Sequence, residues 1–203
     1  MDKIKFKVNK KLLYCITIIT IIGIIAGSIF ITVLNDVDKE TVSNSLNTFI
    51  TNVSNNELNY SLSLRSNLVS NFIFIFVVWI LGMTVVGIPI IIFMYFIKTF
   101  ILGFSLSAII LKYGAKGIIY SFIYVFPHNI LNLFIFAILT IYSLIYSFKL
   151  TDKLTKNENI NYKNNINKHK NILLLSMIGV LLTSLYATYI MPYLFKIVLN
   201  LLK

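Results

Sequence analysis

The chain has 203 residues, of which 58% are hydrophobic and 12% are charged, and its formal net charge is +11. A soluble domain carries about twice that share of charged residues, so the composition excludes a soluble enzyme or binding domain. We interpret the excess lysine as loop charge that orients membrane helices, and we expect no nucleic-acid partner. The single cysteine, Cys15, excludes an intramolecular disulfide and a cysteine-based zinc cluster.

Four long apolar stretches dominate the chain, at 12–34, 72–110, 117–148 and 172–202. About 20 apolar residues cross a bilayer core as a helix, and these stretches lack the alternation that barrel strands need. The sequence therefore predicts an all-α fold, a polytopic transmembrane helix bundle of about five spans. We expect residues 1–203 to form a single membrane domain.

The first predicted span, 12–34, follows a segment with five lysines, which should hold the N-terminus in the cytoplasm. The apolar stretch is too long for a cleaved signal peptide, so we expect a retained anchor. Gly23 and Gly27 form a Gly-x-x-x-Gly pair, which often marks a close helix contact. The contact would lie either within the chain or at the seam of a homo-oligomer.

Residues 35–69 hold few lysines or arginines and are predicted to form an extracytoplasmic loop. Leu46, Phe49, Ile50 and Val53 have helical spacing, which predicts a short amphipathic helix on the outer membrane surface. The loop is either a docking surface for an extracellular partner or a solvated connector.

The segment 70–111 would be about 63 Å long as one helix, so it must cross the bilayer twice. We predict spans at 70–93 and 98–111, with a turn at 94–99 that places Lys98 at the membrane interface. Gly82, Gly87 and Pro89 then fall inside the first of these spans, and Pro89 should kink it.

A short turn is predicted at 112–116, then a span at 117–148, a lysine-rich loop at 149–170 and a last span at 171–194. The loop belongs in the cytoplasm by the positive-inside rule, which requires four spans before it. The C-terminus, a short tail after Pro192, is then extracytoplasmic. Lys112 and Lys116 also lie outside, against the rule.

Polar residues inside the apolar stretches are the candidate functional residues, and the main group is Pro127, His128, Asn129 and Asn132. Pro127 frees a carbonyl one turn earlier, which Asn129 or a neighbouring helix could satisfy. The group could form a proton relay, a metal ligand or a gating kink, or it could serve helix packing. His128 and Asn132 should share a helix face.

No Asp or Glu lies in any apolar stretch, and no Gly-x-Ser-x-Gly or nucleotide-binding glycine motif occurs. We therefore expect no catalytic site, no metal site, no cofactor and no enzymatic activity. Small residues, among them Gly103, should allow close helix approach.

Three blocks carry a family resemblance: Gly-Met-Thr-Val-Val-Gly-Ile-Pro at 82–89, Phe-Ile-Lys-Thr-Phe-Ile-Leu-Gly-Phe at 96–104 and Phe-Pro-His-Asn at 126–129. In this order and spacing they resemble the stage II sporulation protein M (SpoIIM) family of spore-forming Firmicutes. Thr99 departs from the family, which often has glycine after the lysine. The residues matched are structural or partner-binding candidates: Gly82, Gly87, Pro89, Lys98, Gly103, Pro127, His128 and Asn129, to which we add Asn132.

The resemblance implies a multi-pass protein of the cell membrane, in the mother-cell septal and engulfing membrane during sporulation. It implies a non-enzymatic scaffold that localises the peptidoglycan-degrading stage II sporulation proteins D and P during engulfment. The alternative is a permease or channel-like membrane subunit.

Overall fold

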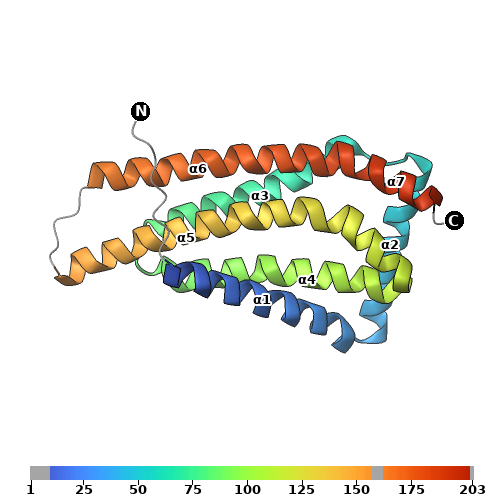
Figure 1. Ribbon diagram of the computed structural model, residues 1–203, viewed down its shortest axis with the longest axis horizontal. Coiled ribbons are helices and arrows are strands. Elements are labelled where there is room, and N and C mark those ends of the chain that lie inside the picture. The colour runs from blue at the N-terminus through green and yellow to red at the C-terminus, as the bar shows by residue number, and fades with distance from the viewer. Residues whose placement is uncertain (1–9, 157–161, 202–203) are drawn as a thin grey trace.

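The computed structural model describes residues 10–156 and 162–201 of the chain. All regular structure in these residues is helical, which confirms the all-α prediction. Long helices run along one common axis, and one helix lies across an end of the bundle (Figure 1). The elements in chain order are α1 (Lys10–Val33), α2 (Asp36–Asn55), α3 (Tyr60–Gly82), α4 (Gly87–Tyr120), the π-helix η1 (Ser121–Val125), α5 (Phe126–Lys156), α6 (Tyr162–Leu185), the π-helix η2 (Tyr186–Ile190) and α7 (Met191–Leu201).

Four stretches of the described residues are long and apolar enough to cross a membrane: Lys10–Val33, Tyr60–Gly82, Gly87–Lys153 and Asn165–Leu201. The third contains two helices, because α4 is interrupted at Gly114 and α5 runs back beside it (Figure 1).

The turn predicted at 112–116 is confirmed at Gly114, which has φ 56° and ψ −131°. Glycine reaches these angles without the steric cost of a side chain, so Gly114 permits the reversal. The bundle therefore contains five long helices, and α1 alone is about 36 Å long, enough for a bilayer core.

The turn between the second and third long helices lies at 83–86, and the prediction that placed it at 94–99 is wrong. The spans predicted at 70–93 and 98–111 shift accordingly to α3 and to the part of α4 before Gly114. Met83, Val85 and Val86 are apolar and no charged residue lies at the turn, so the sequence gave no clear sign of it.

The turn ends at Gly87, and this position requires glycine because a Cβ there would lie 2.0 Å from the Leu81 carbonyl oxygen. The Gly87 N–H donates to Thr84 Oγ1 at 3.0 Å. Pro89 follows in the first turn of α4, where a backbone N–H has no intrahelical acceptor, so proline costs little there. The predicted kink at Pro89 is therefore wrong.

The last helix does not end at Pro192, because α6 continues through η2 into α7 as far as Leu201. The predicted tail after Pro192 is thus helical as far as Leu201. Much of the predicted loop 149–170 is also helical, since α5 extends to Lys156 and α6 begins at Tyr162. Residues 157–161 of that loop lie outside the described residues.

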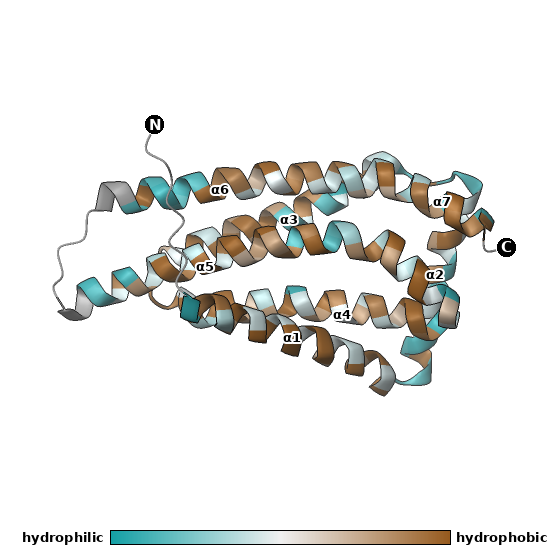
Figure 2. Cartoon of the chain, viewed as in Figure 1, coloured by the Kyte–Doolittle hydropathy of each residue, from teal (hydrophilic) through white to brown (hydrophobic). Residues whose placement is uncertain are grey.

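The two ends of the bundle differ in composition. The start of α1, the end of α5 and the start of α6 lie at one end, while α2, the end of α4 and α7 lie at the other (Figure 1). Hydrophilic residues gather on α2 and on the extensions of α5 and α6 (Figure 2). We call the first the lysine-rich end, after Lys149, Lys153, Lys168 and Lys170, and the second the α2 end, formed by α2, residues 112–116 and α7.

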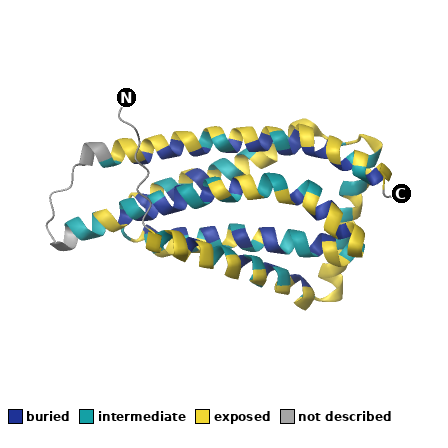
Figure 3. Cartoon of the chain, viewed as in Figure 1, coloured by how far each residue is buried: buried dark blue, intermediate teal, exposed yellow. Residues whose placement is uncertain are grey.

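The helices are buried on one face and exposed on the other (Figure 3), and many large apolar residues are among the exposed ones. The core contains Ile75, Val78, Ile91 and Leu139, each completely buried. On α1, by contrast, the exposed residues include Ile18, Ile21, Ile22, Ile25 and Ile29. An apolar stripe of this size is expected where the surrounding medium is lipid.

Helices α1 and α4 pack backbone to backbone along a seam of glycines. A Cβ on Gly27 would lie 2.0 Å from the Phe100 carbonyl oxygen, and a Cβ on Gly103 would lie 2.1 Å from the Ile24 carbonyl oxygen. The side chain of Ser28 donates to the Gly103 carbonyl at 3.3 Å. The Gly-x-x-x-Gly pair at 23 and 27 therefore forms a contact within the chain.

Candidate functional site

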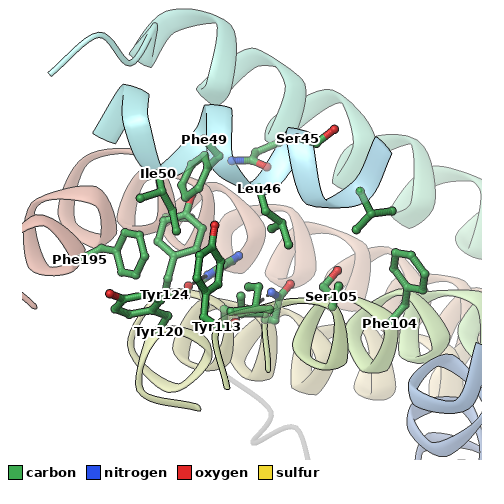
Figure 4. A pocket seen from close by; sticks show the side chains of 18 of the residues that line it. Ser45, Leu46, Phe49, Ile50, Phe104, Ser105, Tyr113, Tyr120, Tyr124 and Phe195 are labelled. Atoms are coloured by element: carbon green, nitrogen blue, oxygen red, sulfur yellow. Dashed lines mark hydrogen bonds between the residues drawn. The ribbon is translucent and has the colours of Figure 1, made fainter. Parts of the chain in front are cut away.

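A cavity of about 540 Å³ lies at the α2 end, and the predicted polar residues His128 and Asn129 are among the residues that line it. Residues from α2, α3, α4, η1, α5, η2 and α7 line it, so it collects segments from most of the chain. Its wall is largely aromatic (Figure 4). The aromatic residues are Phe49, Phe104, Tyr113, Tyr120, Tyr124 and Phe195, and the polar residues include Asn67, Ser105, His128 and Asn129.

Helix α2 covers this cavity with its apolar face. Phe49 and Ile50 point from α2 toward Tyr120 and Tyr124 on the bundle (Figure 4). The ring centroids of Phe49 and Tyr124 are 4.7 Å apart, and Val53 is 3% exposed. The helix predicted from the spacing of Leu46, Phe49, Ile50 and Val53 is confirmed, and its apolar face packs on the bundle.

Polar contacts fix α2 to both neighbouring segments of the α2 end. Tyr113 Oη donates to Asn47 Oδ1 at 3.0 Å, and Lys196 Nζ donates to Asn56 Oδ1 at 2.7 Å. Lys112 Nζ also donates to the Ser43 carbonyl. Helix α2 is thereby held along its middle by the 112–116 turn and at its C-terminal end by α7.

Two π-helical segments border the cavity, and each precedes a proline by the same distance. Pro127 follows η1 and Pro192 follows η2, with one residue between. Proline has no N–H and its ring clashes with the carbonyl four residues earlier. Widening the turn relieves the clash, and the Phe126 N–H then bonds the Ser121 carbonyl five residues back. The disruption that Pro127 causes is thus a π-helical turn, a form that the sequence analysis did not predict.

His128 and Asn129 bond backbone carbonyls of η1. His128 Nδ1 lies 2.9 Å from the Tyr124 carbonyl oxygen, and Asn129 Nδ2 donates to the Val125 carbonyl at 2.9 Å. Since a carbonyl only accepts, His128 Nδ1 carries the hydrogen of this bond. The ring is thus a structural donor to η1.

Asn132 does not join His128, although the two were predicted to share a helix face. Its side chain is 7% exposed and accepts a hydrogen bond from Thr183 Oγ1 of α6. It does not line the cavity. The polar group predicted at 127–132 therefore divides between the cavity and a buried contact of α5 with α6.

Lys98 lies within α4, roughly 16 Å along the helix from Gly87, so its predicted position at a turn is wrong. Its amine is 5.2 Å from the ring centroid of Phe74 and 5.3 Å from that of Phe136. It also bonds Asn71 Oδ1 at 3.4 Å. Aromatic faces and an amide stabilise this ammonium in place of a carboxylate.

Gly82 ends α3 at the lysine-rich end, where Ser147 Oγ bonds both its carbonyl, at 2.9 Å, and the Thr84 carbonyl, at 2.7 Å. A Cβ on Gly82 would lie 2.8 Å from Ser143 Cβ. Gly82, Gly87 and Pro89 thus shape one turn, toward the opposite end of the bundle from the cavity. Sequence reasoning had placed them inside a span.

His169 is a residue that the sequence analysis missed. It is 2% exposed and stacks between Trp79 and Tyr146, with ring centroids 5.4 and 4.8 Å away. The Trp79 indole donates to the His169 carbonyl at 3.2 Å, and His169 Nε2 lies 3.1 Å from the Trp79 carbonyl oxygen. The residue was overlooked because 149–170 was interpreted as a loop.

The chemistry available at the cavity is limited. No three His, Cys, Asp or Glu side chains gather to hold a metal ion in the part of the chain that the structure describes. The polar groups facing the cavity are amides, hydroxyls and one imidazole. This arrangement can bind and orient a partner group by stacking and hydrogen bonding.

Comparison with curated proteins and with solved structures gives no match. Comparison with protein families matches the family described as Stage II sporulation protein M over residues 16–192. The match contains α3, α4, η1 and α5 complete. It therefore includes the cavity residues of these elements, the 83–86 turn and Lys98. The chain therefore belongs to the SpoIIM family of sporulation-related membrane proteins.

Proposed function

We propose that this protein is a non-enzymatic membrane scaffold that localises the peptidoglycan-degrading stage II sporulation proteins D and P at the septal and engulfing membrane during engulfment. The lysine-rich end faces the mother-cell cytoplasm in this proposal, and the α2 end faces the wall. Holding a hydrolase at the membrane raises its effective concentration at the wall without changing its chemistry.

The observation that carries the proposal is the joining of three chain segments into one surface at the α2 end. The segments 35–69, 112–116 and the C-terminal helix α7 are far apart in sequence. Tyr113 and Lys196 bond α2 from the other two segments. In a composite surface of this kind the three segments are already fixed relative to one another before a partner binds. This preorganisation lowers the entropic cost of binding.

The outward face of α2 is the part of this surface that we assign to the partner. Asn44, Thr48, Thr51 and Asn55 recur at helical spacing and are all exposed. They are polar and uncharged, so they suit a hydrogen-bonded contact. Their apolar counterparts on the same helix face the cavity and are not available to a partner.

The permease alternative has less support. Transport past His128, Asn129 and Asn132 needs a continuous wet path, whereas Asn132 is bonded to Thr183 in a buried contact. The sequence also holds no acidic residue in its apolar stretches, where coupled transporters commonly carry one.

The first experiment tests the partner surface. Protein carrying Thr48→Lys and Thr51→Lys, which add bulk and charge to the exposed face of α2, is used to capture proteins from sporulating cells. Asn167→Lys is the matched control, since Asn167 is exposed at the lysine-rich end. Loss of proteins D and P and delayed engulfment in the α2 variant alone support the scaffold. Unchanged capture and normal engulfment would overturn it.

A second experiment tests the orientation. Cys15 is the only cysteine, so Cys15→Ser gives a background without thiols. Asn44→Cys in that background should react with a membrane-impermeant maleimide on intact cells, and Asn167→Cys should react only after lysis. The opposite pattern would place the α2 end in the cytoplasm and remove the proposed contact with wall hydrolases.

A further inference from the structure

A second groove, of about 310 Å³, lies beside the cavity at the α2 end, and Val42, Leu46 and Ala108 line both. It is formed where α1 and α4 end and α2 begins. Its remaining residues combine an apolar wall, which includes Ile31 and Leu111, with a polar side that holds Lys39, Ser43 and Lys112. The groove is therefore amphipathic, with two ammonium groups on one side.

The Lys112 amine is fixed at the groove. It donates to the Ser43 carbonyl and lies 5.3 Å from the ring centroid of Tyr113. An ammonium group has three N–H donors, so two remain for another acceptor. Lys39 is one helical turn before Ser43 on the same face of α2 and is exposed.

The two amines are not matched by acidic residues of the groove. Asp36, Asp38 and Glu40 are on the same helix as Lys39, but they are exposed and none of them lines the groove. Two like charges that share a small site repel each other, so an anion that binds between them is favoured.

The position of the groove indicates what kind of anion this is. Lys112 is two residues before the reversal at Gly114, where the long apolar helices end. Leu111, which lines the groove, is 60% exposed, and Val33, two residues after the groove residue Ile31, is 75% exposed. A soluble anion would contact the amines only, whereas an amphiphile would also cover the apolar wall.

We propose that the groove binds one anionic phospholipid of the leaflet at the α2 end. Its phosphate lies between Lys39 and Lys112, and the start of an acyl chain lies along Ile31 and Leu111. The site explains why Lys112 is at the end of the bundle opposite the lysine-rich end. It is independent of hydrolase docking, since it uses the rim of α2 and not its outward face.

The experiment is a lipid titration of the full chain in detergent, followed by native mass spectrometry. The probes are phosphatidylglycerol, phosphatidylcholine with the same acyl chains, and inorganic phosphate. The test variant is Lys39→Gln with Lys112→Gln. Lys196→Gln is the matched control, because Lys196 is at the same end but bonds Asn56 away from the groove. Lys39→Arg with Lys112→Arg keeps both charges.

We expect phosphatidylglycerol to bind more tightly than phosphatidylcholine. Each lysine should contribute about fivefold to that preference, so the double glutamine variant should lose about twenty-fivefold. Lys196→Gln and the double arginine variant should keep it. Lys39→Gln alone, at an exposed position, should lose about fivefold, which covers the case in which the double variant does not fold.

Three results would overturn the proposal. The unchanged protein could show no preference between the two headgroups. The control Lys196→Gln could lose as much as the double glutamine variant, which would indicate general surface charge. Inorganic phosphate could displace the lipid at equal concentration, which would indicate a site for a soluble anion.

Discussion

Replacing Gly27 by alanine tests whether α1 and α4 really meet backbone to backbone. The new Cβ would lie 2.0 Å from the Phe100 carbonyl oxygen and 2.8 Å from the Phe104 nitrogen. Real Cβ atoms stay at least 3.0 Å from such atoms, and both neighbours are backbone, so no side chain can rotate away. The two helices must separate by about 1 Å along the seam, which in a packed interior typically costs 1–3 kcal/mol, about the range known for overpacking.

The matched control is Gly179→Ala in α6. Its Cβ would lie 2.8 Å from Ile135 Cδ1, the far end of a flexible side chain. Alanine gains up to about 1 kcal/mol over glycine in a helix, so this variant should be neutral or slightly stabilised. The difference between the two variants isolates the cost of the seam from the intrinsic gain.

The assay is reversible unfolding in mixed micelles with increasing denaturing detergent, followed by the fluorescence of Trp79, the only tryptophan. Trp79 stacks on His169 and should report loss of the bundle. We expect Gly27→Ala to be less stable than Gly179→Ala by 1–3 kcal/mol, about the overpacking cost. Equal stability of the two variants would show that α1 does not pack on α4 as described.

Three further substitutions can be measured in the same assay. Gly114→Ala meets no atom within 4 Å, so its cost is backbone strain at φ 56°, about 1–3 kcal/mol; a stability equal to the parent would contradict the turn. Ser147→Ala leaves two turn carbonyls without their donor and should destabilise by about 1–3 kcal/mol, whereas an exposed control, Ser45→Ala, should not. Asn132→Leu alone should cost more than Asn132→Leu combined with Thr183→Val, because the single change leaves a buried hydroxyl without its partner; additive losses would show that the pair is not coupled.

The helical bundle and most of its reversals follow from local features of the sequence. The apolar stretches, the glycine at 114 and the amphipathic spacing in 46–53 are each visible in a short window. The 83–86 turn is not, because three of its four residues are apolar and none is charged. The only charge in that region, Lys98, suggested a turn at 94–99, yet the structure stabilises Lys98 inside the bundle with two aromatic rings.

The candidate site could be predicted only in part. His128 and Asn129 stand out because they are polar residues beside a proline in an apolar stretch. That α2 covers them, and that α7 and the 112–116 turn hold α2, depends on contacts between segments up to 140 residues apart in sequence. The π-helical turns before Pro127 and Pro192 were equally hidden, since a missing N–H predicts disruption but not its form.

Helix α2 also sets a distance within the molecule. Helix α1 packs mainly on α4, while α3 packs on α4, α5 and α6. These two helices, next to each other in the chain, lie on different sides of the bundle, and α2 connects them across its end (Figure 1). At 20 residues α2 is about 30 Å long, and as a helix it sets the spacing between the end of α1 and the start of α3. Removing one helical turn from α2 would shorten this connection by about 5 Å and shift α1 along the glycine seam that it forms with α4.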